Sequence, residues 1–128
     1  ALAMIRLGVD ELHHNADAAA LGLFSAVLEH PDVHAYGADA DQSSLAPGRV
    51  PASAVIDLPR AMLLVAREVA GEGFAPRVES FGLASGVIRF ELNPALRDKL
   101  PTELLQRVNA AADSIAAGTL QVTGRGVQ

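Results

Sequence analysis

Strand-like and helix-like segments alternate along this chain, and that alternation constrains its fold more than any other feature. Strand candidates lie at Leu7–His14, Val33–Ala38, Val50–Ile56, Arg77–Phe81, Val87–Leu92 and Leu120–Val122. Helix candidates lie at Ala18–His30, between Asp57 and Gly71, and at Pro101–Ala117. Strands that alternate with helices are typical of an α/β fold in which the strands run parallel. We therefore predict a three-layer α/β fold, with a parallel sheet flanked by helices.

The helix boundaries follow from local chemistry. Asp57 can accept a hydrogen bond from a free amide of the next turn, and Pro59 fits the first turn because its missing N–H costs nothing there. Gly118 fits the left-handed position that follows a helix. Apolar residues at helical spacing predict the buried faces, for example Leu21, Phe24, Val27 and Leu28.

Composition excludes several classes of function. The 128 residues suit one domain, and half of them are hydrophobic, which is enough for a core. Without cysteine there is no disulfide, thiolate nucleophile or cysteine metal site. The net charge of -5 is spread along the chain, and the few aromatics form no stacking platform, so we expect no nucleic-acid partner.

No apolar run is long enough to span a bilayer. The segment Ala1–Arg6 lacks the charged region and the long apolar stretch of a signal peptide, and Met4 is not the first residue. We therefore expect a processed or trimmed chain.

Two polar segments follow predicted strands and are the first places to look for a ligand. They are residues 13–17 and residues 39–42. In open α/β sheets, ligands bind beyond the carboxyl ends of the strands. We predict that Asp39 faces a cleft and accepts hydrogen bonds from a ligand. For Asp41 and Gln42, we favour the alternative that they build the turn through their own backbone.

Catalysis and metal binding find little support in the sequence. Ser43, Ser53 and Ser85 could act as nucleophiles, but none lies in a Gly-x-Ser-x-Gly elbow. His13 and His14 are adjacent in a predicted strand, so their side chains point to opposite faces and cannot readily grip one ion. We predict no enzyme activity, no cofactor and no metal site.

An ordered set of short motifs resembles the basic membrane protein family. The pieces are Gly22–Ala26, Gly37–Gln42, Ser43–Gly48, Val50–Ser53, Phe81–Leu83 and Ile115–Val122. Among them, Gly37–Gln42 stands in the place of the family's Gly-Val-Asp-Ser-Asp-Gln. The match covers nearly the whole chain in one collinear order.

This resemblance implies the C-terminal portion of a type I periplasmic-binding-protein-like receptor. Residues 1–45 would belong to the second lobe, and residues 46–128 would form the hinge and return to the first lobe. Such a receptor is an extracytoplasmic protein, membrane-anchored or periplasmic, that delivers a solute to the permease of an ABC transporter. Characterised relatives bind purine nucleosides in a cleft between two lobes. Here Asp39, His13, Asn15 and Ser53 would supply the ligand contacts of residues 1–128.

The sequence departs from the family pattern at three places. His13 replaces an aromatic residue, Ile56 replaces a lysine, and residues 17–20 replace a glycine-rich turn. The missing lysine and the altered turn support a second hypothesis, a regulatory or structural ligand-sensing domain that has lost transport. Family members are at least twice as long, so an N-terminal half or a second chain is an expected partner. Apolar surface left uncovered would then favour association, including a homodimer.

Overall fold

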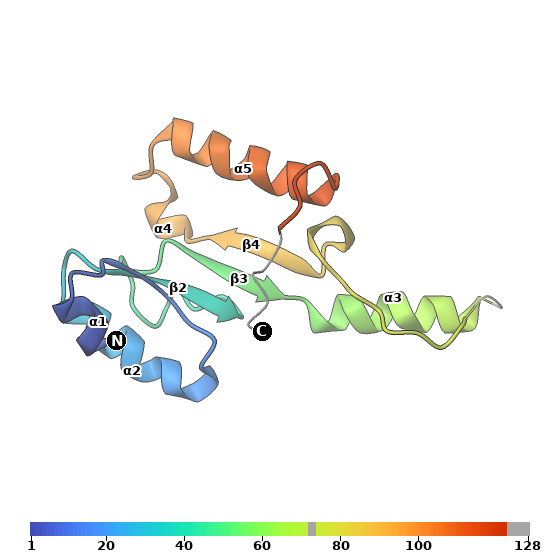
Figure 1. Ribbon diagram of the computed structural model, residues 1–128, viewed down its shortest axis with the longest axis horizontal. Helices are drawn as coiled ribbons and strands as arrows, with labels where there is room; N and C mark the ends of the chain where they lie inside the picture. Colours follow the sequence, from blue (N-terminus) through green and yellow to red (C-terminus); the bar gives the residue numbers. More distant parts are fainter. Residues whose placement is uncertain (72–73, 123–128) are drawn as a thin grey trace. The chain divides into compact units, whose positions relative to one another are not determined.

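The computed structural model describes residues 1–71 and 74–122 of the chain (Figure 1). Its strands are β1 (Glu11–His13), β2 (His34–Asp39), β3 (Ala52–Ile56) and β4 (Ile88–Leu92). Its α-helices are α1 (Leu2–Arg6), α2 (Leu21–Leu28), α3 (Leu58–Ala70), α4 (Pro94–Arg97) and α5 (Thr102–Ala116). The short 3-10 helices are η1 (Asp17–Ala20) and η2 (Leu83–Ser85).

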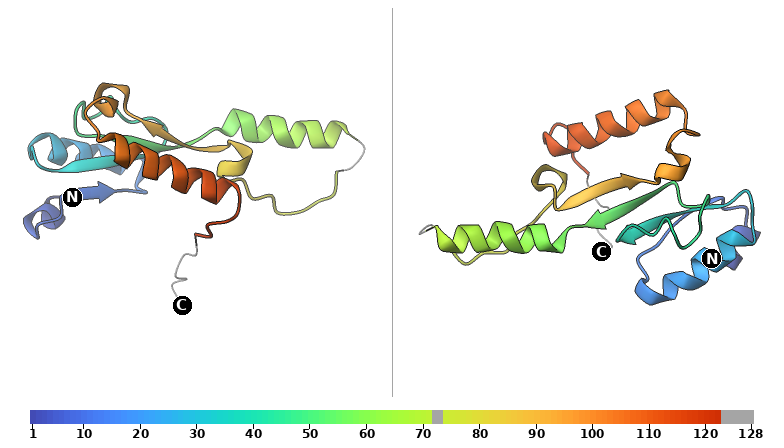
Figure 2. Two further views of the ribbon diagram at one scale, coloured as in Figure 1. Left: turned by 90° about the horizontal axis from the view of Figure 1, so that it is seen from above. Right: turned by 180° about the vertical axis from the view of Figure 1, so that it is seen from behind.

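The strands form one sheet in the order β1-β2-β3-β4. The pairs β1–β2 and β2–β3 are parallel, with His13 opposite Tyr36 and Gly37 opposite Ser53. β4 runs against β3, as the opposed arrows show (Figures 1 and 2), and the Asn93 N–H donates to the Pro51 carbonyl at 2.9 Å. The predicted α/β class with a parallel sheet is confirmed for β1 to β3, and β4 adds an antiparallel strand.

The chain divides into two compact units. The first comprises residues 1–56 and 89–99, and the second comprises residues 57–88 and the chain from residue 100 on. The first unit contains the hydrophobic core, in which α2 packs on β1 and β2. The fully buried side chains at its centre are Leu12, Phe24, Val27 and Val50. The predicted division into lobes at about residue 45 stays a prediction.

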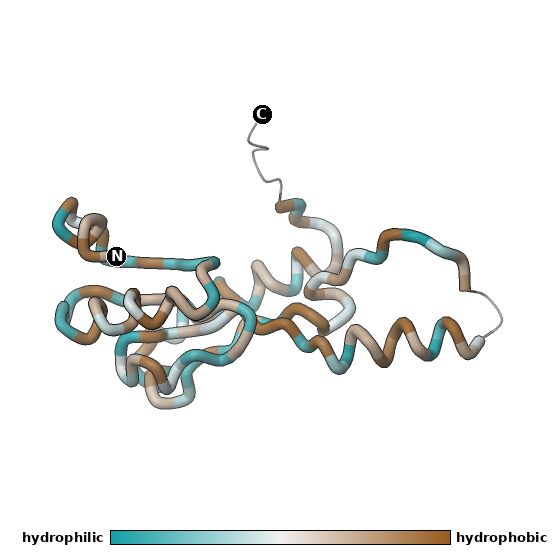
Figure 3. The backbone as a smooth tube through the Cα atoms, turned by 90° about the horizontal axis from the view of Figure 1, so that it is seen from below, coloured by the Kyte–Doolittle hydropathy of each residue, from teal (hydrophilic) through white to brown (hydrophobic). Residues whose placement is uncertain are grey.

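In the second unit, α3 begins as the sequence predicts. The Asp57 carboxylate accepts from the Arg60 N–H at 2.9 Å, and Pro59 lies in the first turn. Hydrophobic and hydrophilic residues recur in turn along α3 (Figure 3). Within the described residues of this helix, only Ala61 is buried. α3 therefore has an apolar face that this unit leaves largely exposed.

Two segments of the second unit that were predicted as strands are described in the structure but do not form strands. In place of a strand at residues 77–81, Arg77 reaches back to α3 and pairs with both carboxylate oxygens of Glu68 at 2.6 and 2.9 Å. The backbone beside it has no partner strand, and Val78 is 94% exposed. In place of a strand at residues 120–122, the Leu120 N–H donates to the carbonyl of Ser114, which ties that segment to the end of α5.

Other boundaries differ by a few residues. The predicted strand Leu7–His14 is shorter, because Gly8 makes a turn with a φ of +86° and only Glu11–His13 pairs with β2. The predicted helix Ala18–His30 starts as the 3-10 turn η1 and continues as α2. Gly118 follows α5 with a φ of +72°, which confirms its predicted left-handed position.

Candidate functional site

The carboxyl ends of β1 and β2 lie at the same edge of the sheet because the two strands are parallel neighbours. His13 ends β1 and Asn15 follows it, while Asp39 ends β2. All three side chains are exposed. The sequence predicted these residues as ligand contacts, and the fold brings them to one edge of the first unit. Their contact with a ligand stays a prediction.

Asp39 is presented on a tight turn. Its φ is +67°, and the Ala40 N–H donates to the Ala38 carbonyl across it at 2.8 Å. A hydrogen bond between residues two apart, with a positive φ between them, defines a rare and strained γ-turn. Strained residues other than glycine persist only where the surrounding contacts hold them, and they cluster at functional sites.

The Gln42 side chain and backbone hold this turn. The Gln42 Oε1 atom lies 2.9 Å from the Ala38 backbone nitrogen, which donates to it, and 2.8 Å from the His14 Nε2 atom. The Gln42 N–H donates to the Ser53 Oγ atom at 3.1 Å. Gln42 thus joins the residue that follows β1 to β2 and β3. Sequence reasoning placed it only as a turn-building residue.

Ser53 lies below this turn and is fully buried. Its hydroxyl accepts from Gln42 and lies 3.5 Å from the Asp41 Oδ1 atom. Gly37, opposite Ser53 on β2, leaves the space that the hydroxyl occupies. The described contacts of Ser53 are therefore with the turn, and its predicted contact with a ligand stays untested.

Asp41 also makes its hydrogen bonds within the turn. The Ser43 hydroxyl donates to its Oδ1 atom at 2.6 Å, and the Ser43 N–H donates to the same atom at 3.0 Å. These two hydrogen bonds favour the charged carboxylate, so they lower the pKa of Asp41. This geometry agrees with the turn-building role that the sequence favoured for Asp41.

The sheet face opposite α2 carries a second polar group, of which the sequence singled out only His13. Glu11 and His13 on β1 alternate with buried Leu12, and they face His34 and Tyr36 on β2. Burial raises the pKa of Tyr36, and the charge of Glu11 and a hydrogen bond to it raise it further. The alternation of polar and apolar residues along both strands was the signal that could have found this group.

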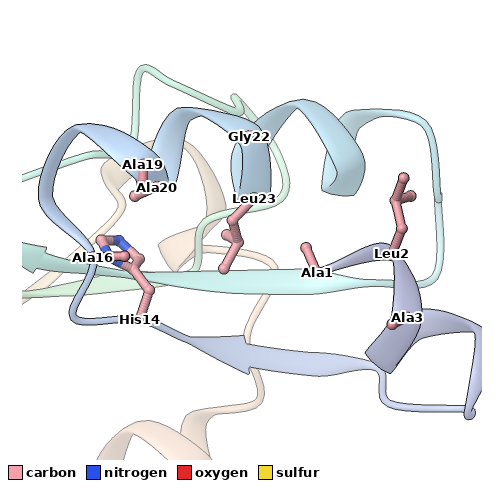
Figure 4. Close-up of a pocket in the computed structure, with 9 residues that line it drawn as sticks. All are labelled: Ala1, Leu2, Ala3, His14, Ala16, Ala19, Ala20, Gly22 and Leu23. Atoms are coloured by element: carbon pink, nitrogen blue, oxygen red, sulfur yellow. The ribbon is translucent and has the colours of Figure 1, made fainter.

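His14, which the sequence did not single out as a ligand contact, is buried at this edge. It is only 7% exposed, and its ring meets the edge of Phe24 with the ring centroids 5.4 Å apart. The ring lies just after the end of β1, beneath Ala19 and Ala20 of η1, the turn that leads into α2 (Figure 4). Its Nδ1 atom is buried and has no hydrogen-bond partner among the described residues.

His14 also lines a hollow of about 550 Å³, in which it is the polar side chain. The other lining residues are Ala1, Leu2, Ala3, Ala16, Ala19, Ala20, Gly22 and Leu23 (Figure 4). A smaller hollow of about 310 Å³ in the second unit lies beside α3, between Leu64, Glu68 and Phe81. Small apolar residues dominate the larger hollow, so polar recognition there rests on His14.

Residues 1–71 and 74–122 contain no group of three or more histidine or acidic side chains placed to hold a metal ion. Within the same ranges, no helix combines the length and apolarity needed to cross a membrane.

Comparison with protein families gives a match over residues 1–124 to the family described as Bmp, ABC transporter substrate-binding protein PnrA-like. Basic membrane protein A2 of Borrelia garinii subsp. bavariensis is 30% identical over 111 residues, which cover 84% of this chain and 32% of that protein. Basic membrane protein A of Borreliella afzelii is also 30% identical, over 84% of this chain and 33% of that protein. The chain thus spans about a third of the length of these curated relatives.

Solved structures share the fold. A transcriptional activator of the comK gene from Bacillus halodurans superposes with a TM-score of 0.80 and 16% identity, over 95% of this chain and 42% of that one. An ABC transporter system solute-binding protein from Aeropyrum pernix K1 superposes with a TM-score of 0.77 and 19% identity, over 98% of this chain and 43% of that one. At these identities the likeness concerns the fold alone.

Proposed function

The chain belongs to the family of PnrA-like substrate-binding proteins of ABC transporters, and we propose that it binds a small polar solute for import. The family is one of binding proteins, in agreement with the prediction that the chain is not an enzyme. The proposed ligand site is the edge of the sheet formed by Asp39, His13 and Asn15. Ser53 supports the site through its contacts with Gln42 and Asp41.

The observation that carries this proposal is that three exposed polar side chains lie at or just beyond the carboxyl ends of two neighbouring parallel strands. The Asp39 carboxylate can accept hydrogen bonds from hydroxyl groups or from an amine. The His13 ring can stack on a flat ring, and the Asn15 amide can donate and accept. A nucleoside combines a flat base with ribose hydroxyls, so nucleosides are the first ligands to test.

Ile56 sets a limit on the affinity for such a ligand. It ends β3 and is 40% exposed, in the place where the family resemblance expects a lysine. A lysine could donate a charged hydrogen bond to a ribose hydroxyl, and isoleucine cannot. We therefore propose that the ligand is held at the Asp39 edge with one charged contact fewer than in the family pattern.

The proposed receptor needs more polypeptide than the described units supply. α3 exposes Leu58, Met62 and Val69 by 65%, 70% and 55%, and large exposed apolar patches mark interaction surfaces. The relatives are about three times as long as this chain. We propose that an N-terminal half or a second copy of the chain covers α3, and that an ABC permease is the transport partner.

Isothermal titration of the purified protein with purine and pyrimidine nucleosides tests the ligand proposal. The variant Asp39→Asn removes the charge and keeps a residue that tolerates the positive φ. We expect it to weaken binding by about 1–1.5 kcal/mol, the difference between a hydrogen bond to a charged group and one to a neutral group. Asp32→Ala is the matched control, because Asp32 is an exposed aspartate that precedes the amino end of β2.

Equal affinity of the Asp39→Asn variant and the unchanged protein would remove Asp39 from the site. Absence of binding across the nucleoside panel would refute the nucleoside assignment. Native mass spectrometry of the same samples reports the assembly state and any retained small molecule. A lone monomer of 13.3 kDa would refute the proposed second copy.

A second candidate function is regulation. It is favoured by the likeness of fold to the structure titled a transcriptional activator, together with Ile56 in the lysine position. Such a protein would sense a ligand without delivering it. Cell fractionation separates the two functions, because the transport proposal places the protein outside the cytoplasm, at the membrane or in the periplasm. Recovery in the cytosolic fraction would favour regulation.

A further inference from the structure

The Gln42 side-chain oxygen fixes the position of a hydrogen on His14. The Oε1 atom faces two nitrogens, the Ala38 backbone nitrogen at 2.9 Å and the His14 Nε2 atom at 2.8 Å. A backbone N–H can only donate, so the atom that faces Ala38 must be the amide oxygen. That oxygen can only accept, so the His14 Nε2 atom must carry the second hydrogen. In a neutral ring the Nδ1 atom is then an acceptor.

We propose that His14 is a positioning residue that holds Asp39 in its ligand-binding geometry. The hydrogen bond from His14 orients the Gln42 amide, and the oriented amide accepts the Ala38 N–H. Ala38 is the first residue of the γ-turn that carries Asp39. His14 thereby acts on Asp39 through Gln42 and does not contact the ligand itself. The expected effect of His14 on ligand affinity rests on the proposed function, whereas its expected effect on the geometry of the turn does not.

The same hydrogen bond joins the two halves of the proposed site. His14 lies between His13 and Asn15 at the end of β1, whereas Gln42 lies beyond the end of β2. A bond of 2.8 Å between their side chains fixes the spacing of the two strand ends. Groups held in this way before a ligand arrives lose less conformational freedom on binding, which improves affinity.

A simple core role for His14 would predict different contacts. The ring is 7% exposed and packs edge-on against Phe24, so an apolar residue of similar size would fill the place. A buried Nδ1 atom without a partner is costly, and buried polar groups are otherwise almost always satisfied. The Nε2 hydrogen bond to Gln42 gives a reason for a histidine here that packing alone does not supply.

Two variants separate the hydrogen bond from the packing. His14→Gln places an amide donor near the position of the Nε2 atom, and His14→Leu fills the space beside Phe24 without a donor. Hydrogen exchange of the Ala38 amide, followed by NMR, reports directly on the bond that Gln42 accepts. We expect exchange about tenfold faster in His14→Leu and little change in His14→Gln, since one neutral hydrogen bond is lost in the first variant only.

Ligand affinity provides the second readout. His14→Leu should weaken the binding of the best nucleoside by about threefold to tenfold, the loss that one neutral hydrogen bond accounts for. His14→Gln should restore most of that loss. Equal weakening in both variants, with Ala38 exchange unchanged, would show a packing role and overturn the proposal.

The nitrogen NMR signals of His14 in the unchanged protein test the proposal without any variant. We expect the pattern of a ring that carries hydrogen on Nε2. Hydrogen on Nδ1 alone would overturn the proposal, whether or not the variants fold. If no nucleoside binds, the ligand assignment fails, and the Ala38 exchange and the ring signals still decide the role of His14.

Discussion

Gly37 occupies the tightest position beneath the proposed site, and alanine there is the sharpest test of the described packing. A Cβ atom at Gly37 would lie 2.3 Å from the Ser53 Oγ atom, 2.8 Å from the Ser53 Cβ atom and 3.0 Å from the Gln42 Cβ atom. The backbone of Gly37 does not adopt a positive φ, so only the available space opposes a side chain. Ser53 is fully buried and cannot turn into solvent.

The cost of Gly37→Ala follows from two effects. Overpacking of a buried site costs about 1–3 kcal/mol. Displacement of the Ser53 hydroxyl also leaves the Gln42 N–H without its acceptor, which costs about 1–3 kcal/mol more. Alanine also lowers the conformational entropy of the unfolded chain, which stabilises the folded protein by about 0.4–1 kcal/mol. We therefore expect Gly37→Ala to lower the free energy of unfolding by about 1–5.5 kcal/mol.

Urea unfolding followed by circular dichroism measures this change. Gly22→Ala is the matched control, because Gly22 lies in α2 and a Cβ atom there would meet nothing within 4 Å. We expect Gly22→Ala to raise the free energy of unfolding by about 0.5–1 kcal/mol, the difference in helix propensity between the two residues.

A double-mutant cycle identifies the contact responsible. Ser53→Gly removes both Ser53 atoms that the new Cβ atom would meet. In the Ser53→Gly background, Gly37→Ala should cost at least about 1 kcal/mol less than it costs alone, because residues in contact are not additive. A Gly37→Ala cost below about 1 kcal/mol, or an additive double mutant, would refute the described packing of β2 against β3.

Two further predictions concern pH. Tyr36 is the sole tyrosine and there is no tryptophan, so ultraviolet absorbance reports its ionisation directly. We expect the pKa of Tyr36 to lie above 10.0 because of burial and Glu11. The stability that protonated Tyr36 contributes is therefore complete below its ordinary pKa, and it is lost as the pH rises through the raised pKa of the folded protein. Glu11→Gln should lower this pKa without returning it to 10.0, and an unchanged titration would contradict the pairing. For Asp41, the Ser43 hydrogen bonds lower the pKa below 3.8. The stability that the charged Asp41 carboxylate contributes is therefore complete above pH 3.8, and it is lost as the pH falls through the lowered pKa. Ser43→Ala should raise the pKa of Asp41, as measured by carboxyl NMR titration, and an unchanged pKa would exclude Ser43 as the cause.

Local chemistry made most of the elements predictable. The Asp57 cap, Pro59 and the left-handed Gly118 act through neighbouring residues, and each appears where the sequence placed it. The two predicted strands that do not form would each have needed a second strand, distant in the sequence, to pair with. The segment at residues 77–81 has β-branched and aromatic residues, but its backbone lies beside no strand, and Arg77 pairs with α3 instead.

The candidate site was predictable in part for the same reason. The ends of parallel strands share an edge, so the sequence could place His13, Asn15 and Asp39 together without knowing a single distance. It could not reveal that Ser53 is buried beneath the turn, or that Asp39 lies on a γ-turn. Both depend on the register of β2 with β3, which sets Gly37 opposite Ser53.

The sequence by itself determined the α/β class, the family and the polar strand ends, because periodicity, capping residues and ordered motifs are properties of neighbouring residues. Only the tertiary structure decided what each polar group contacts. His14 and Gln42 are 28 positions apart, and their bond exists because β1 and β2 pair in one register. A partly buried hydrogen bond between distant residues depends on the pairing of the strands that bring them together, and no local pattern encodes it.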